Sequence, residues 1–112
     1  MSIYKIMRAD EWAALRRDRT SDGAPVDLAD GFVHLSSGAQ VRETAARHFG
    51  GEDGLMLVAL DEERLGDDLR WEPSRGGDAF PHLYAPLRLD AVEWAQPLPW
   101  DGAAHLFPEG IA

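Results

Sequence analysis

The feature that most constrains this chain is an uninterrupted apolar run, Leu55–Leu60, near the middle of the sequence. The run has the length of a strand, and a strand without alternating polar residues must be covered on both faces. We therefore expect it to form the central strand of a sheet and to anchor the core. A chain of 112 residues can build one such core without disulfide or metal links. We expect a single domain over 1–112, with its core at about 3–97 and an irregular tail at 98–112.

Two helices and a long loop are predicted in the first half of the chain. Asp10 is a suitable cap for a short helix at about 11–17, and the spacing of apolar residues predicts a second helix at about 41–49. Residues 19–30 contain turn formers and no sustained period, which favours a loop that could act as a lid.

Short runs of β-forming residues indicate the remaining strands. They lie at 3–7, 31–36, 69–72, 82–84 and 87–94. Because the helices come early and most strands come late, the predicted class is α+β. We expect a small split sheet, mixed or antiparallel, with two short helices.

The composition excludes several classes of function. The chain has no cysteine, which excludes a disulfide framework, thiolate metal sites and a cysteine nucleophile. It carries 20 acidic and 11 basic residues, with a formal charge of -9 and Lys5 as its one lysine, so phosphate-backbone binding is not expected. The sequence shows neither a membrane-length apolar run nor a signal-peptide pattern. We expect a cytoplasmic protein, a monomer or weak homodimer, with no nucleic-acid or membrane partner.

Polar side chains occur in pairs along three of the predicted strands. Because alternate residues of a strand point to the same face, each pair shares a face. The pairs are His34 with Ser36, Arg70 with Glu72, and His82 with Tyr84. If the three faces converge, they line a ligand pocket. Taken singly, each residue also has a structural explanation, such as a hydrogen-bonded histidine or a solvent-facing ion pair.

Common catalytic and cofactor motifs are absent from the sequence. It has no Gly-rich phosphate loop, no dinucleotide fingerprint and no nucleophile elbow. Zinc could use His34, His82 and Glu72, but none of them lie at a short diagnostic spacing. We therefore expect no metal.

Two segments carry most of a family resemblance: Gly31–Ser36, which reads Gly-Phe-Val-His-Leu-Ser, and Phe80–Tyr84, which reads Phe-Pro-His-Leu-Tyr. Further matching residues, in order along the chain, are Ile3–Ile6, Trp12, Gln40–Val41, Thr44–Ala45 and Trp71–Glu72. Together they resemble the bacterial family catalogued as domain of unknown function 952.

That family is similar in fold to the ADP-ribosyltransferases, in which two small sheets hold NAD in a cleft. The resemblance implies that His34 and Ser36 bind the nicotinamide ribose and that Glu72 stabilises positive charge on the sugar. His82 completes the expected catalytic set. The other implied ligand-binding residues are Trp71 or Tyr84 for the nicotinamide ring and Arg70 or Arg75 for the pyrophosphate.

Two alternatives stay open beside an NAD-binding domain that cleaves or transfers from its ligand. Leu35 stands where the transferases usually have glycine, which favours a non-catalytic module that binds a small ligand or a peptide. A third hypothesis is a partner domain whose tail, residues 94–107, docks on another protein.

Overall fold

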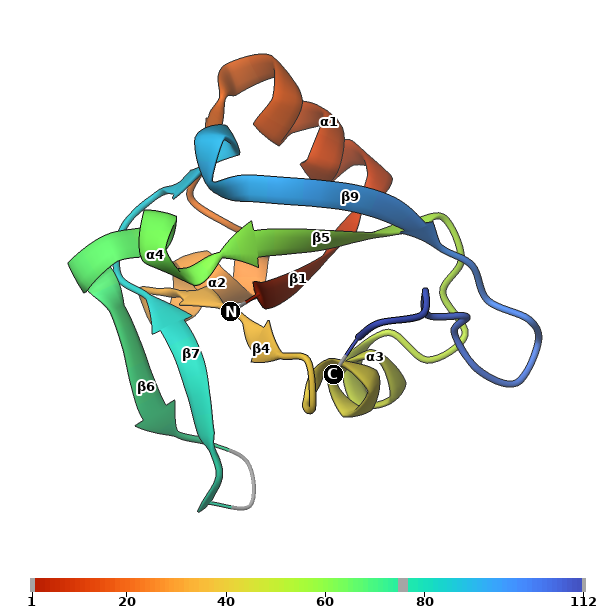
Figure 1. The fold of residues 1–112 in the computed structure, drawn as a ribbon. Coiled ribbons are helices and arrows are strands. Elements are labelled where there is room, and N and C mark those ends of the chain that lie inside the picture. Colours follow the sequence, from red (N-terminus) through yellow and green to blue (C-terminus); the bar gives the residue numbers. More distant parts are fainter. Residues whose placement is uncertain (1, 75–76, 112) are drawn as a thin grey trace.

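A four-stranded antiparallel sheet is the centre of the computed structural model, which describes residues 2–74 and 77–111 (Figure 1). In spatial order its strands are β4 (Ser36–Ser37), β1 (Ser2–Arg8), β5 (Leu55–Asp61) and β9 (Val92–Leu98). β5 lies between β1 and β9, and its residues Leu57–Leu60 are fully buried. The predicted central strand, covered on both faces, is confirmed.

A second antiparallel sheet adjoins the first, with its strands in the order β3 (Val33–His34), β7 (Ala79–Leu83) and β6 (Leu69–Pro73). The chain passes from this sheet to the first at Leu35, whose side chain is buried in the core and whose N–H donates to the carbonyl of Pro81. The single strand predicted at 31–36 is therefore wrong. Burial of Leu35 between the sheets divides it into β3 and β4.

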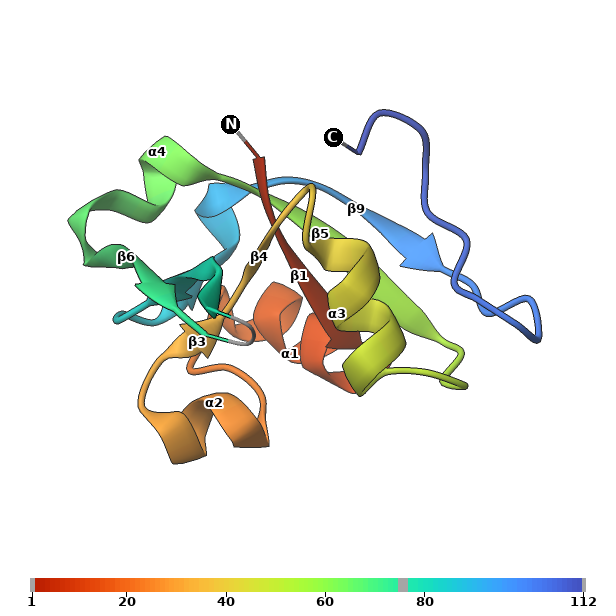
Figure 2. The same ribbon diagram turned by 90° about the horizontal axis from the view of Figure 1, so that it is seen from below.

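Four short helices accompany these sheets in the described part of the chain (Figures 1 and 2). They are α1 (Ala9–Asp18), α2 (Pro25–Asp30), α3 (Val41–His48) and α4 (Glu62–Leu65). α1 begins before the predicted cap Asp10, because Arg8 takes the cap position and its N–H donates to Glu11 Oε1 at 2.8 Å. The predicted α+β class with a small split sheet is confirmed, with every strand pairing antiparallel among the described residues.

The loop predicted at 19–30 is wrong, because this segment contains a short strand and a helix. β2 (Thr20–Ser21) pairs with β8 (Leu87–Arg88), and α2 follows it. α2 starts at Pro25, whose fixed φ suits a first helical turn, and ends at Gly31 in a left-handed conformation with φ +85°. A helix of six residues is too short to show an apolar period in the sequence.

The C-terminal part of the chain is more broken than predicted. The strand expected at 87–94 is divided by a 3₁₀ turn, Leu89–Ala91, into β8 and β9. Beyond β9 the chain is irregular, but Phe107 and Ile111 pack against its own core, which argues against a docking tail. Arg42 of α3 contributes to this packing with its guanidinium 5.1 Å from the ring of Phe107.

Apolar clusters cover both faces of the main sheet. Ile3 and Met7 of β1 belong to the cluster that extends beneath the second sheet, whereas Tyr4 and Ile6 belong to the cluster beneath α3. Lys5 lies between Ile3 and Met7 in the sequence and is 7% exposed. A lysine at this position needs a buried partner. No helix in the described part is long and apolar enough to span a membrane.

Candidate functional site

Of the three polar pairs predicted from the sequence, all members except Ser36 converge on one face of the second sheet. His34 lies opposite His82 between β3 and β7, and His82 lies opposite Arg70 between β7 and β6. Directly opposed residues of an antiparallel pair share a face, as do residues two apart on one strand. Glu72 and Tyr84 therefore lie on this face as well, where their contacts confirm the placement.

Glu72 is the centre of a partly exposed cluster on this face. Its Oε1 accepts a hydrogen bond from the Tyr84 hydroxyl at 2.6 Å and lies 2.8 Å from His82 Nδ1. The pKa of Glu72 is lowered first by the hydrogen bond from Tyr84 and then by that from His82. The bond between Tyr84 and Glu72 also raises the pKa of Tyr84. The Arg70 guanidinium lies 5.4 Å from the centre of the Tyr84 ring. Glu72 is thus held in place as an ionised carboxylate.

Phe32, which no motif identified as a site residue, connects the two histidines. Its ring stacks on His82 with the centroids 4.2 Å apart and lies 4.5 Å from the His34 ring. The two imidazole rings are 5.8 Å apart, edge to face. His34, His82 and Glu72 therefore form one continuous group, well within the reach of a single ligand.

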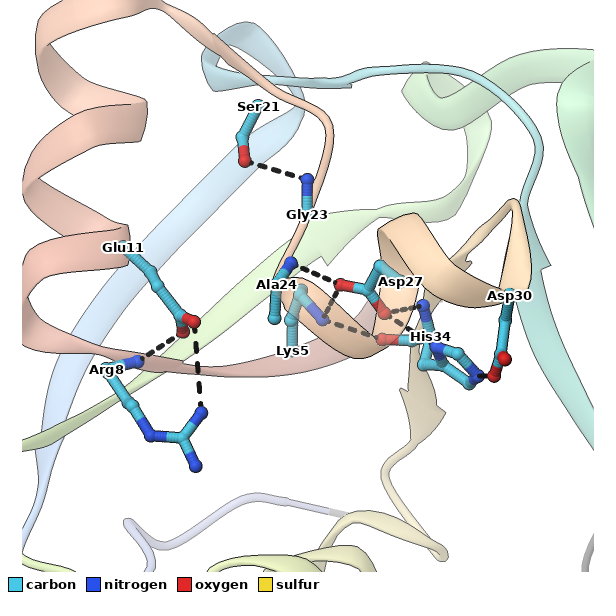
Figure 3. Close-up of polar contacts among 9 residues, drawn as sticks. All are labelled: Lys5, Arg8, Glu11, Ser21, Gly23, Ala24, Asp27, Asp30 and His34. Carbon is cyan, nitrogen blue, oxygen red and sulfur yellow. Dashed lines mark hydrogen bonds and ion pairs between the residues drawn. The ribbon is translucent and has the colours of Figure 1, made fainter.

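A second carboxylate, that of Asp27, contacts both the backbone and the ring of His34 (Figure 3). Asp27 Oδ1 accepts from the backbone N–H of His34 at 2.9 Å and lies 2.6 Å from its Nδ1. Oδ2 lies 3.0 Å from Lys5 Nζ and accepts from the N–H of Ala24 at 2.7 Å. Lys5 Nζ also donates to the carbonyl of His34 at 3.1 Å. Three separate elements, β1, α2 and β3, are joined through this one carboxylate.

Asp27 is ionised although it is almost completely buried, with 1% of the residue exposed. Burial by itself would raise the pKa of the carboxyl group. The hydrogen bond from His34 and the charge of Lys5 outweigh burial and bring the Asp27 pKa well below its usual range. The contact is a buried ion pair whose remaining acceptor positions are filled by backbone N–H groups.

Neither Asp27 nor Lys5 was predicted to belong to the site. Asp27 lies in the segment interpreted as a loop, where aspartate is an ordinary turn former. Lys5 gave a usable signal, because it is the one lysine of the chain and lies inside a strand of apolar residues. A charge in that position predicts a buried partner but does not identify it.

A cleft of about 560 Å³ opens beside these residues, where β4 ends and leaves part of β1 uncovered. Figure 2 shows α2, α3 and β6 around β1 and β4 on this side of the molecule. The predicted residues His34, Ser36 and His82 line the cleft, together with Asp27 and Asp30. A larger hollow of about 800 Å³, next to α4 and β8, contains none of the predicted site residues.

Several predicted residues lie outside the cleft wall. Trp71 is on the opposite face of β6, where its Nε1 donates to Glu62 at 3.2 Å. Arg70, Glu72 and Tyr84 do not line the cleft but adjoin it through His82. Arg75 lies outside the described residues.

Ser36 is on the cleft wall but belongs to the first sheet, apart from the polar face. Its hydroxyl is 2.8 Å from that of Thr44, so the two share a hydrogen bond. Over residues 2–74 and 77–111 there is no group of three or more histidine and carboxylate side chains placed to hold a metal ion.

The site therefore contains two carboxylate–imidazole pairs, Asp27–His34 and Glu72–His82, whose histidines lie on neighbouring strands. A carboxylate beside an imidazole fixes the orientation and tautomer of the ring, which is a requirement for acid–base chemistry. The second nitrogen of His34, Nε2, lies 3.0 Å from Asp30 Oδ2 at the end of α2. The arrangement can bind hydroxyl groups and place a negative charge near them.

Comparison with known proteins gives one family and solved structures of one relative. The family model described as "Protein of unknown function (DUF952)" matches residues 6–95. The crystal structure of protein CC0527 from Caulobacter crescentus is 47% identical, covers 95% of this chain and 94% of that chain, and has a TM-score of 0.90. Its solution NMR structure is 48% identical, covers 93% and 90% of the two chains, and has a TM-score of 0.82. No curated protein matches the sequence.

Proposed function

Because the chain belongs to the DUF952 family, described only as a protein of unknown function, we propose its function from its own geometry: the cleft beside His34 binds NAD or a related nucleotide. The observation that carries the proposal is the joined group of His34, His82 and Glu72 at a cleft of ligand size. The resemblance of the His34-x-Ser36 segment to the ribose-binding strand of ADP-ribosyltransferases supports the same ligand class.

In this proposal the ligand's ribose lies against His34. Nε2 of His34 contacts Asp30, which lines the cleft, and Ser36 lines it as well. Glu72 contributes a fixed negative charge beside His82, and Arg70 is the nearest predicted cation on that face. The part predicted for Arg75 in holding the pyrophosphate stays a prediction from the sequence.

The reaction that fits these groups is cleavage of the bond between nicotinamide and ribose. The bond electrons leave with nicotinamide, positive charge develops at the ribose carbon, and water or an acceptor oxygen then forms the new bond. A carboxylate that is already ionised and oriented stabilises such charge without reorganisation. Glu72 has both properties because His82 and Tyr84 hold it.

A second candidate, a binding module without turnover, is favoured by two specific observations. Glu72 is engaged by both neighbours and is not part of the cleft wall. Leu35, between the two ribose-binding positions, is buried in the core, so its side chain fills space where glycine would allow a close approach. These observations favour binding over catalysis in the proposed site.

Titration calorimetry with NAD, ADP-ribose and nicotinamide tests the binding proposal. We expect heat of binding with NAD, and its loss in His34→Ala. His105→Ala is the matched control, because His105 lies in the tail, where its Nε2 donates to the backbone carbonyl of Glu52 and its ring contacts Trp100. Absence of heat with all three compounds at millimolar concentration would overturn the proposal.

Release of nicotinamide, followed by chromatography, distinguishes the two candidates. If the protein is an enzyme, Glu72→Gln abolishes release and keeps NAD binding, while Glu63→Gln, an exposed carboxylate on α4, leaves both unchanged. If the unmodified protein binds NAD and releases no nicotinamide, it is a binding module.

A further inference from the structure

The two nitrogens of the His34 ring have different surroundings. Nδ1 faces the buried carboxylate of Asp27 at 2.6 Å, and Nε2 faces the carboxylate of Asp30 at 3.0 Å (Figure 3). The Asp27 side chain is fully buried, whereas that of Asp30 is 48% exposed at the rim of the cleft. One partner is therefore fixed inside the protein, and the other is a half-exposed residue of the cleft wall.

The contact with Asp27 determines which nitrogen carries a proton. An ionised carboxylate only accepts hydrogen bonds, so His34 Nδ1 must be the donor. Asp27 has no freedom to turn away, because its two oxygens also accept from Lys5 Nζ and from the backbone N–H groups of Ala24 and His34. By the same rule, the contact between Nε2 and Asp30 Oδ2 needs a proton on Nε2. When the ring is neutral and carries one proton, the buried contact with Asp27 keeps that proton on Nδ1 and leaves Nε2 without one.

We propose that Asp27 is the positioning residue of the cleft, which keeps one proton of His34 on Nδ1 so that Nε2 is left to meet the ligand, and that Asp30 accepts from the protonated Nε2 until a ligand hydroxyl replaces it. The part concerning Asp30 rests on the proposed nucleotide-binding function. The part concerning Asp27 is a property of the free protein.

A neutral hydroxyl, such as that of a ribose, is the ligand group that fits this position. The half-exposed carboxylate of Asp30 places negative charge next to Nε2, which disfavours an anionic oxygen of a phosphate there, whereas the charge of Asp27 is compensated by Lys5. Once Asp30 has turned into water, a hydroxyl can accept from the protonated Nε2 or donate to Nε2 of the neutral ring. Turning is cheap, because an exposed pair of this kind is weakly held.

Long-range proton–nitrogen NMR of the histidine rings tests the role of Asp27 without any ligand. At a pH where free imidazole is neutral, we expect His34 to carry its proton on Nδ1 in the unmodified protein. Asp27→Asn offers an amide N–H₂ to Nδ1 and should transfer the proton to Nε2. Lys5→Met is the matched control, because it removes the other buried charge and leaves Asp27 beside the ring.

The NMR result can overturn the positioning role of Asp27 in either of two ways. The unmodified protein could show the proton on Nε2, which is decisive even if Asp27→Asn fails to fold. Alternatively, Lys5→Met could shift the tautomer as much as Asp27→Asn, in which case the signature follows the loss of the buried pair rather than the carboxylate on the ring.

Calorimetry with NAD tests the role of Asp30. We expect Asp30→Ala to bind NAD about two- to fivefold more tightly, since no carboxylate has to leave Nε2. We expect Asp27→Asn to bind about tenfold more weakly, since a charge-assisted hydrogen bond that orients the ring is lost. Unchanged or weaker binding by Asp30→Ala overturns the exchange at Nε2.

The two experiments also separate this inference from the proposed function. If NAD does not bind the unmodified protein, the proposed function and the exchange at Asp30 both fail, while the NMR signature still decides the role of Asp27. If NAD binds but His34 carries its proton on Nε2, the proposed function stands and the positioning role of Asp27 is overturned.

Discussion

The two carboxylate–imidazole pairs of this protein are built with opposite burial. In Asp27–His34 the carboxylate is fully buried and the imidazole is 34% exposed, whereas in Glu72–His82 the imidazole is 7% exposed and the carboxylate 37%. The first pair therefore presents a ring nitrogen to the solvent side, and the second presents a carboxylate. A site that needs both a hydroxyl-binding group and a negative charge obtains one from each pair.

Burial also decides how much each pair matters for folding. Asp27 is removed from water and compensated by Lys5, so loss of either partner leaves an uncompensated charge in the core. Glu72 remains in contact with water, which screens its interactions. We therefore expect loss of the Asp27 pair to lower the free energy of unfolding, and loss of the Glu72 pair to change mainly the local charge and pKa values of the site.

Asp27→Ala is the variant with the largest expected effect on this comparison. It leaves the Lys5 ammonium buried beside a single carbonyl and removes the acceptor of two backbone N–H groups. We expect the free energy of unfolding to fall by about 3–5 kcal/mol, measured by urea denaturation followed by tryptophan fluorescence. The double variant Lys5→Met, Asp27→Ala should recover part of this loss. A loss no larger than that of the exposed control Asp18→Ala would show that the pair is not essential to the fold.

Acid sensitivity should follow the same buried carboxylate. The pKa of Asp27 is depressed in the folded protein, so its contribution to stability is present above the ordinary aspartate value of about 3.9 and is lost as the pH falls below it. Urea denaturation between pH 7 and pH 2 should show a steep decline below about pH 4. In Asp27→Asn this decline should be shallower. If the free energy of unfolding fell equally steeply with pH in both proteins, Asp27 would not be the source of the acid sensitivity.

The contrast between the pairs also explains what the sequence could predict. The face that carries His34, Arg70, Glu72, His82 and Tyr84 followed from the alternation of residues along strands, and strand pairing in register then brought them together. The central strand followed from its apolar run. Such features depend on local patterns, which a single sequence contains.

The buried pair could not be predicted in the same way, because its partners come from three distant elements. Nothing in the sequence near Asp27 indicates that its side chain contacts Lys5 and His34. The short helix α2 that carries Asp27 has no apolar period. The strand break at Leu35 depends on the packing of two sheets against each other. These contacts are properties of the tertiary structure, which overrides local propensity.

Gly23→Ala tests whether the backbone around the buried carboxylate is as constrained as the pair itself. Gly23 has a φ of +100°, and a Cβ there would clash with the carboxylate of Asp27. Gly51→Ala is the matched control, with a φ of +84° and open space around the Cβ position. The left-handed strain common to both should destabilise by about 1–2 kcal/mol. In thermal denaturation, Gly23→Ala should lower the melting temperature more than Gly51→Ala does. It should also shift the NMR signals of the His34 ring. Equal destabilisation by the two variants would mean that Asp27 can move.

Tyr84→Phe has the smallest expected effect on folding and tests the exposed pair. It removes the hydrogen bond that contributes most to lowering the pKa of Glu72, so that pKa should rise toward its ordinary value in a carbon NMR titration. Trp71→Phe is the control, because Trp71 donates to a different carboxylate, Glu62, on the opposite face of β6. The urea midpoint should change little in either variant, because water can replace the lost partner of an exposed carboxylate. A large drop in the midpoint with no change in the Glu72 pKa would show that the second pair, like the first, serves the fold rather than the charge at the site.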